Sequence, residues 1–164
     1  LTGFMPCGKS TIGQTLAHLT GRKFWHLDSE IERTQGMSIS EIFSSSGQQE
    51  FRRLEKECLS GLIESLKKKS ARAVIALGGG AFCQDGTRQI VLETCQSVYL
   101  EVPYSIIRQR LGESDPTRPL SKDSEALFYS RVKTYAKADF KVDASSQDSV
   151  LTARRIIDIL SPSL

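Results

Sequence analysis

The chain has 164 residues, a formal net charge of +3, and proportions of charged and apolar residues that are ordinary for a globular protein. Such a length fits one compact domain, so we expect residues 1–164 to form a single unit. The small charge does not indicate a nucleic-acid partner, because many basic residues stand beside acidic ones. No apolar run approaches the roughly 20 residues of a membrane span, so we expect no membrane partner.

The cysteine spacing bears on the cellular compartment. None of the four cysteines forms a CxxC pair or a Cys/His cluster with metal-ligand spacing. We interpret them as reduced thiols, which predicts a cytoplasmic protein. They are Cys7, Cys58, Cys83 and Cys95.

The beginning of the chain predicts a strand, a helix and a second strand. Residues 1–4 are expected to be the end of the first strand, and residues 23–27 form a short second strand. Between them, residues 10–19 predict a helix, because their apolar residues share one face. A glycine-rich segment separates the first strand from this helix.

A mostly helical region is expected at residues 28–69. Ser38 and Glu41 have capping-box spacing, which predicts a helix that begins there. From Phe51 to Leu66, apolar residues recur at intervals of three and four, as they do on the buried face of an amphipathic helix.

Strands and helices alternate through the rest of the chain. The apolar run at residues 73–77 is typical of a buried parallel strand. Pro103 suits the first turn of a helix that ends near Leu111, and the polar segment 112–123 is expected to be a loop. The remaining elements are strands at 97–102 and 140–143 and helices at 124–138 and 149–160. The alternation predicts an α/β fold, with a five-stranded parallel sheet and at least five helices on its two faces.

Residues 3–10, GFMPCGKS, match the pattern GxxxxGK[ST] of a phosphate-binding loop (P-loop). A polyphosphate needs convergent backbone N–H groups and a helix N-terminus, and glycines let the backbone approach it. Lys9 is expected to reach the β- and γ-phosphates, and the Ser10 hydroxyl to hold Mg²⁺. The predicted ATP contacts in this loop are Pro6, Cys7, Gly8, Lys9, Ser10 and Thr11.

A phosphate loop alone indicates only a nucleoside triphosphate, so the acceptor must be argued from other residues. Asp28 follows the second strand, where it either orients an acceptor hydroxyl or caps a helix. Arg52 either clamps a carboxylate or pairs with a neighbouring glutamate. Gly78, Gly79 and Gly80 end the third strand, where they either bring backbone N–H groups to an anion or form a plain loop.

Three arginines in the second half are further candidates. Arg118 lies in the loop 112–123, where it is expected to close over the phosphates as part of a lid. Arg131 lies on the helix that follows, and Arg110 lies near the end of the helix before the loop. Taken alone, each of these arginines would be interpreted as a solvated side chain.

Together the motifs form a recognisable set. Their order is GFMPCGKST, LDSEIERTQG, FRRLE, LGGGA, RPL and RVKTYAKAD. Over nearly the whole chain, this set resembles the shikimate kinase family in order and approximate spacing. The combination of FRxxE with GGGA separates it from gluconate, adenylate and cytidylate kinases.

The resemblance implies a P-loop kinase that transfers the γ-phosphoryl group of ATP to the 3-hydroxyl of shikimate, in aromatic amino acid (chorismate) biosynthesis. It implies Mg²⁺ as the cofactor, a helical substrate-binding region at about 28–69 and a lid at about 112–123. We expect a monomer whose partners are ATP and shikimate. The residues expected to bind shikimate are Asp28, Arg52, Gly78, Gly79, Gly80 and Arg131.

The same resemblance assigns the remaining roles. Arg118 is the expected lid arginine and contacts ATP, and Arg110 is expected to pack near adenine, where the loop 144–149 matches the family loosely. The residues expected to be catalytic are Lys9, Asp28 and Arg118.

Two positions depart from the family pattern. Pro6 has no N–H group, so one donor of the phosphate cradle is absent. His26 stands where the family commonly has a second acidic residue near Mg²⁺, and an imidazole does not replace a carboxylate there, because Mg²⁺ prefers oxygen ligands. These departures leave a non-catalytic homologue as an alternative, beside another small-metabolite kinase of the same fold.

Overall fold

The computed structural model describes residues 1–114 and 122–161, which form four strands and seven α-helices. The strands are β1 (Lys23–His26), β2 (Ala73–Ala76), β3 (Val98–Glu101) and β4 (Phe140–Asp143). The helices are α1 (Lys9–Leu19), α2 (Leu27–Gln35), α3 (Ile39–Lys68), α4 (Asp85–Thr94), α5 (Tyr104–Ser114), α6 (Lys122–Tyr135) and α7 (Ser149–Leu160). A 3₁₀ turn, η1 (Ala81–Cys83), lies between β2 and α4.

The strands pair in parallel, as expected, but the predicted five-stranded sheet is wrong. Among the described residues, β1 pairs with β2 and β3 pairs with β4, which gives two sheets of two strands each. The predicted first strand, residues 1–4, is reduced to a single parallel bridge between Thr2 and Tyr99.

Leu1 and Thr2 form a seam that joins the two sheets. Successive residues of a strand turn their N–H and C=O groups to opposite edges, so Leu1 bonds to one sheet and Thr2 to the other. Because only one residue bonds to each sheet, the segment forms an isolated bridge and does not extend either sheet as a further strand. Leu1 bonds to Ile75 and Leu77 at 2.6 and 3.0 Å, and Thr2 bonds to Val98 and Leu100, both at 2.9 Å.

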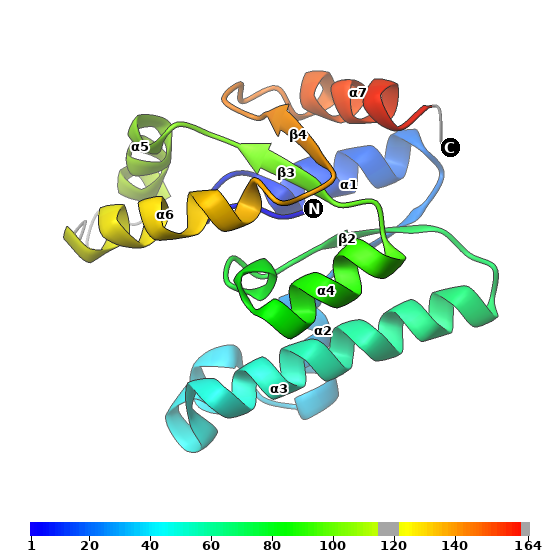
Figure 1. Cartoon of the computed structure of the whole chain (residues 1–164), viewed down its shortest axis with the longest axis vertical. Coiled ribbons are helices and arrows are strands. Elements are labelled where there is room, and N and C mark those ends of the chain that lie inside the picture. The colour runs from blue at the N-terminus through cyan, green and yellow to red at the C-terminus, as the bar shows by residue number, and fades with distance from the viewer. Residues whose placement is uncertain (115–121, 162–164) are drawn as a thin grey trace.

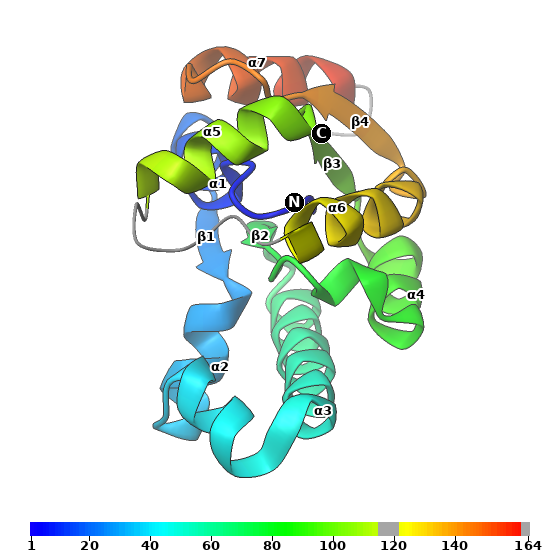
Figure 2. The same cartoon turned by 90° about the vertical axis from the view of Figure 1, so that its left-hand side faces the viewer.

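Helices cover both sides of the strands (Figures 1 and 2). α1 and α7 pack on each other on one side, where α1 also contacts β1 and β2. α3 and α4 pack together on the other side. In Figure 1, β3 and β4 point to the left, and Figure 2 looks onto that edge, where α5 and α6 lie.

Most predicted boundaries agree with the structure to within a few residues. The capping box is formed as expected: Ser38 Oγ accepts a hydrogen bond from Glu41 N–H at 3.2 Å, and Glu41 Oε2 accepts one from Ser38 N–H at 2.7 Å. Both ends of the predicted loop 112–123 are helical, because α5 continues to Ser114 and α6 begins at Lys122, and residues 115–121 lie outside the described part of the chain. The sequence assigned no element to α4.

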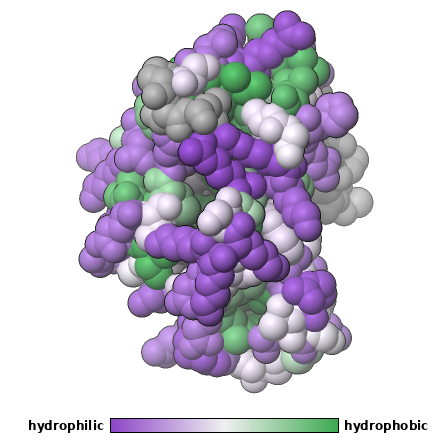
Figure 3. All heavy atoms as spheres, turned by 90° about the vertical axis from the view of Figure 1, so that its right-hand side faces the viewer, coloured by the Kyte–Doolittle hydropathy of each residue, from purple (hydrophilic) through white to green (hydrophobic). Residues whose placement is uncertain are grey.

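The opposite edge, where the strands begin, carries an apolar cavity of about 540 Å³. Its walls come from helices on both sides of the strands, with Leu16 and Ile156 on one side and Leu59 and Val91 on the other. Figure 3 faces this side, where apolar side chains lie recessed between polar ones. None of the residues predicted to bind a substrate lines this cavity. Among the described helices, none is long and apolar enough to cross a bilayer.

Candidate active site

The phosphate loop wraps around the N-terminus of α1. Gly3 and Gly8 have φ values of 145° and 91°, which L side chains rarely adopt, so glycine is required at both ends of the loop. A side chain at Gly3 would also lie 2.9 Å from the Leu100 carbonyl oxygen. Because Gly8 is the N-cap of α1, the loop ends at the positive pole of that helix.

The N–H groups of the loop are not equally available to a phosphate. Cys7 N–H donates to the Phe4 carbonyl at 2.8 Å, and Pro6 has no N–H to offer. The Met5–Pro6 peptide bond is cis. The first N–H groups of a helix have no intrahelical partner, so the first turn of α1 supplies the donors. The predicted ATP contacts at this turn are Gly8, Lys9, Ser10 and Thr11.

Lys9 closes the loop on itself. Its Nζ donates to the Gly3 carbonyl at 2.8 Å and lies 3.8 Å from Cys7 Sγ, and only 8% of the residue is exposed. The ammonium group is therefore held between the start and the end of the loop, beside the donors of α1. From this position a small movement of the side chain would bring the charge onto a bound phosphate.

The predicted acceptor residues come together around the glycines that follow β2. A Cβ atom added to Gly78 would lie 2.5 Å from Asp28 Oδ1 and 3.0 Å from Glu55 Oε1. A Cβ atom added to Gly80 would lie 2.4 Å from Arg52 Nη2. The side chains therefore approach the backbone so closely that only glycine fits at both positions. The sequence predicted that a ligand approaches these glycines, and the structure places the side chains of Asp28, Glu55 and Arg52 against Gly78 and Gly80.

Gly79 connects this cluster with the phosphate loop. A Cβ atom added to Gly79 would make ordinary contact with Met5, at 3.6 Å from its Cβ and 3.8 Å from its N. The phosphate loop therefore lies next to the glycine triplet, with Met5 beside Gly79.

Arg52 and Glu55 form a buried ion pair. Arg52 Nη1 lies 2.7 Å from Glu55 Oε2, and the Glu55 side chain is fully buried. A pair with a neighbouring glutamate was the alternative to substrate binding for Arg52, and the structure forms this pair at the edge of the acceptor cluster. Glu55 was not predicted as a site residue. The spacing of three residues in FRRLE was the available signal, because side chains three apart on a helix are neighbours.

Three buried polar atoms of the cluster have no hydrogen-bond partner among the described residues: Asp28 Oδ1, Glu55 Oε1 and Arg52 Nε. Burial raises the pKa of Asp28, and this effect outweighs the opposing influence of His26, Lys9 and Arg52. Burial also raises the pKa of Glu55, despite its bond to Arg52. Buried polar groups normally have hydrogen-bond partners, so these three atoms are arranged to form hydrogen bonds with a polar ligand.

Arg131 contributes positive charge to the same cluster. Its guanidinium lies 6.0 Å from the centre of the Phe4 ring, at the phosphate loop, and its charge lowers the pKa of Glu55. The structure therefore brings Arg131, from α6, to the same region as Arg52, from α3. Two cations and two carboxyl groups face one another there.

The other predicted residues lie farther from the acceptor cluster or outside the description. Arg110 donates to the carbonyls of Ala144 and Ser145 at 3.2 and 3.0 Å, so it contacts the loop that was expected near adenine. His26 is the N-cap of α2, because its Nδ1 accepts a hydrogen bond from Ser29 N–H at 3.4 Å. Arg118 lies outside the described residues.

A phosphate loop at a helix N-terminus, in a parallel α/β fold with an acceptor region against it, is the arrangement of a P-loop kinase. The sequence profile named shikimate kinase matches residues 5–161. The shikimate kinase of Geobacter sulfurreducens is 40% identical over 153 residues, which cover 90% of this chain and 81% of that protein. The chain belongs to the shikimate kinase family, whose members are phosphotransferases with an alcohol acceptor.

Solved structures of the family have the same fold. The shikimate kinase of Aquifex aeolicus has a TM-score of 0.85 and 30% identity, and the match covers 98% of this chain and 94% of that one. The shikimate kinase of Acinetobacter baumannii, solved in complex with shikimate, has a TM-score of 0.81 and 31% identity, with 99% and 92% covered. These matches confirm the α/β P-loop kinase fold.

Proposed function

We propose that this chain transfers the γ-phosphoryl group of ATP to the 3-hydroxyl of shikimate, giving 3-phosphoshikimate and ADP. The observation that carries the proposal is the acceptor cluster of polar atoms without hydrogen-bond partners, which lies beside the phosphate loop at Gly79 and Met5. Shikimate has a carboxylate and three hydroxyl groups, and the cluster offers cations for the former and carboxyl groups for the latter. A relative with 31% identity was solved with shikimate bound, which supports the same acceptor here.

Each half of the site has a defined task in this proposal. Lys9 and the N–H groups of α1 neutralise charge on the phosphates. Asp28 accepts a hydrogen bond from the 3-hydroxyl, and its poorly hydrated carboxyl group is a stronger base than an exposed one. Arg52 and Arg131 hold the carboxylate of shikimate, with Gly78–Gly80 against the ring. The rate enhancement comes from alignment and charge stabilisation, with no covalent intermediate.

The residues present fit Mg²⁺ as the divalent cation. Within residues 1–114 and 122–161, no group of three or more His, Cys, Asp or Glu side chains is placed to hold a metal. This suits Mg²⁺, which is commonly held by few protein oxygens together with substrate phosphates and water. Ser10, next to Lys9 on the first turn of α1, would supply a hydroxyl oxygen. When bound, the cation offsets negative charge on the phosphate oxygens.

The proposal is tested by ADP release with ATP and Mg²⁺, using shikimate, gluconate and nucleoside monophosphates as acceptors. We expect ADP release to depend on shikimate and on Mg²⁺. Lys9→Ala should lower kcat at least about a hundredfold, whereas Lys68→Ala, at an exposed position on α3, should leave it unchanged. If a folded sample binds both ligands without turnover, the chain is a non-catalytic homologue. Turnover with gluconate instead would contradict the assignment of the acceptor.

Other expectations stand as parts of the same proposal. They are a single domain with its substrate-binding region at about 28–69, a monomeric state, and a cytoplasmic location. The location rests on the cysteines, and the structure has all four as free thiols.

A further inference from the structure

Tyr135 is a buried side chain that the reaction described above does not use. It is the last residue of α6, it is fully buried, and its ring stacks on Tyr99 of β3 with 5.5 Å between the ring centres. The stacked ring would by itself account for a packing role. The phenolic hydroxyl, however, reaches out of this apolar contact and donates a hydrogen bond to the Gly79 carbonyl.

This bond acts on the middle of the glycine triplet. The Gly79 carbonyl and the Gly80 N–H belong to one peptide unit, which is planar, and this unit is trans. In a trans peptide the C=O and N–H groups point in opposite directions. A hydrogen bond that holds the Gly79 carbonyl towards Tyr135 therefore turns the Gly80 N–H away from α6.

The Gly80 N–H, turned away from α6, has no backbone carbonyl as a partner among the described residues. A Cβ atom on Gly80 would lie 2.4 Å from Arg52 Nη2, so the residue adjoins the guanidinium proposed to hold a carboxylate. The residue that carries this N–H therefore lies beside a side chain of the acceptor cluster.

The peptide unit needs a partner to keep this direction. Its rotation changes ψ of Gly79 and φ of Gly80, and glycine at both positions removes the steric barrier that a Cβ atom would impose. The same absence of side chains that lets Asp28 and Arg52 approach the backbone therefore makes the backbone free to turn. A fixed acceptor site requires a bond from outside the triplet.

We propose that Tyr135 is a positioning residue for the acceptor, which orients the Gly80 N–H towards the acceptor by holding the Gly79 carbonyl. This inference rests on the proposed function, because it takes shikimate as the ligand of that N–H. Tyr135 also contacts Arg131, which precedes it by one helical turn, and Cys83 of η1. One hydroxyl thus connects α6, the glycine triplet and the turn after it.

The test compares Tyr135→Phe with Tyr99→Phe, which removes a hydroxyl from the other ring of the same stack. Equilibrium titrations with shikimate and, separately, with Mg·ATP give the dissociation constants, and thermal melting reports the fold. We expect Tyr135→Phe to raise the dissociation constant for shikimate about tenfold, the loss of a hydrogen bond to a charged ligand. The constant for Mg·ATP should change less than twofold, and Tyr99→Phe should change neither constant.

The outcomes separate this inference from the proposed function. If the wild-type protein does not bind shikimate, the proposed function is wrong and this inference falls with it. If the wild-type protein binds shikimate and folded Tyr135→Phe binds it equally well, only the role of Tyr135 is contradicted. An equal loss of affinity for shikimate and Mg·ATP would show that the hydroxyl supports the fold alone, and it would also overturn the inference.

Discussion

Two carboxyl groups, those of Asp28 and Glu55, lie close to Gly78. Burial destabilises both as anions and raises the pKa of each, and the charge of Asp28 raises the pKa of Glu55 further. Arg52 compensates Glu55 directly, through a bond of 2.7 Å. Asp28 Oδ1 has no such partner among the described residues, so Asp28 is the group that a ligand hydroxyl would satisfy.

This arrangement predicts that Asp28→Asn stabilises the protein at neutral pH. A carboxyl group whose pKa is higher in the folded state lets the folded protein bind more protons, so stability falls as pH rises between the two values. Burial raises the pKa of Asp28 above 3.8, so the penalty is absent below about pH 4 and complete above the folded-state pKa. Without the charge, the melting temperature at pH 7 should rise by about 2–4 °C.

Melting curves between pH 4 and pH 8 measure this effect. The difference in melting temperature between Asp28→Asn and wild type should disappear towards pH 4. The kcat of Asp28→Asn should be about a hundredfold or more below that of wild type, because the acceptor hydroxyl loses its base. Asp158→Asn, at an exposed position on α7, is the control and should change neither quantity. An Asp28→Asn protein that melts lower than wild type at pH 7 would contradict the electrostatic argument.

The arginines of the cluster should separate substrate binding from stability. Arg52→Ala and Arg131→Ala should each raise the KM for shikimate about tenfold to a hundredfold, through the loss of a charge-assisted bond, with little change in the KM for ATP. Only Arg52→Ala leaves a fully buried carboxylate, on Glu55, without its partner, which costs about 3–5 kcal/mol of stability.

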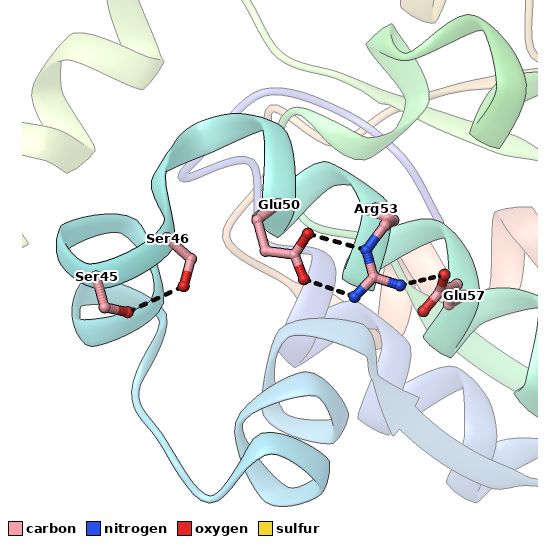
Figure 4. A network of polar contacts seen from close by, with 5 residues as sticks. All are labelled: Ser45, Ser46, Glu50, Arg53 and Glu57. Atoms are coloured by element: carbon pink, nitrogen blue, oxygen red, sulfur yellow. Dashed lines mark hydrogen bonds and ion pairs between the residues drawn. The ribbon is translucent and has the colours of Figure 1, made fainter.

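Arg53→Ala is the matched control for both arginines. Arg53 is adjacent to Arg52 in sequence, but it bonds to Glu50 and Glu57 on the exposed side of α3 (Figure 4). Exposed ion pairs contribute little to stability, so this variant should retain the wild-type KM values and melting temperature. Equal increases in the KM values for shikimate and ATP in Arg52→Ala or Arg131→Ala would mean that these arginines are structural.

At the scale of the elements, the proposed substrate-binding region contains a kink in α3. Gly47 has φ 78° and ψ 177° inside the span Ile39–Lys68, so the helix is interrupted there. Phe43 and Phe51 pack against each other across the interruption, with 4.7 Å between their ring centres. The kink therefore fixes how the first turns of α3 lie against the segment that carries Arg52 and Glu55.

The two glycines of α3, Gly47 and Gly61, should respond in opposite directions to replacement with alanine. Gly47→Ala places an L side chain in a conformation that only glycine adopts readily, and it should destabilise the protein by about 1–3 kcal/mol. Gly61 has no positive φ, and a Cβ atom there meets nothing within 4 Å. Gly61→Ala should therefore stabilise by about 0.5–1 kcal/mol. Urea unfolding measures both, and a stable Gly47→Ala protein would show that the kink is not required.

At the scale of the whole molecule, the sequence predicted what depends on local patterns. The phosphate loop, the capping box at Ser38 and the parallel strand pairs follow from spacing and periodicity. The kink at Gly47 could not be predicted in this way, because the φ of a glycine within an amphipathic pattern cannot be read from the sequence. Nor was the burial of Glu55 predictable, since charged residues are seldom fully buried, and two of its neighbours, Asp28 and Gly78, are far from it in the sequence. The prediction of a five-stranded sheet was wrong, because the sequence pattern cannot show that residues 1–4 bond to each of the two sheets through a single residue, Leu1 or Thr2.

That seam offers a test of how the two halves of the molecule are held together. Thr2 is 1% exposed, and its Oγ1 is buried without a hydrogen-bond partner among the described residues. Replacing such a hydroxyl with a methyl group removes an unmet polar group while the shape is kept, so Thr2→Val should stabilise by about 1 kcal/mol. The melting temperature should then rise by about 2–4 °C.

Thr152→Val is the matched control with the opposite sign. Thr152 is equally buried, but its Oγ1 donates to the Asp148 carbonyl at 3.1 Å, so its loss should destabilise by about 0.5–1.5 kcal/mol. Because Thr2 joins the sheets β1–β2 and β3–β4, its gain should appear as a shift of one unfolding transition, with an unchanged slope in urea. If Thr2→Val lowers the midpoint, the hydroxyl has a stabilising partner, and the apolar cavity beside the seam is the place where that partner would lie.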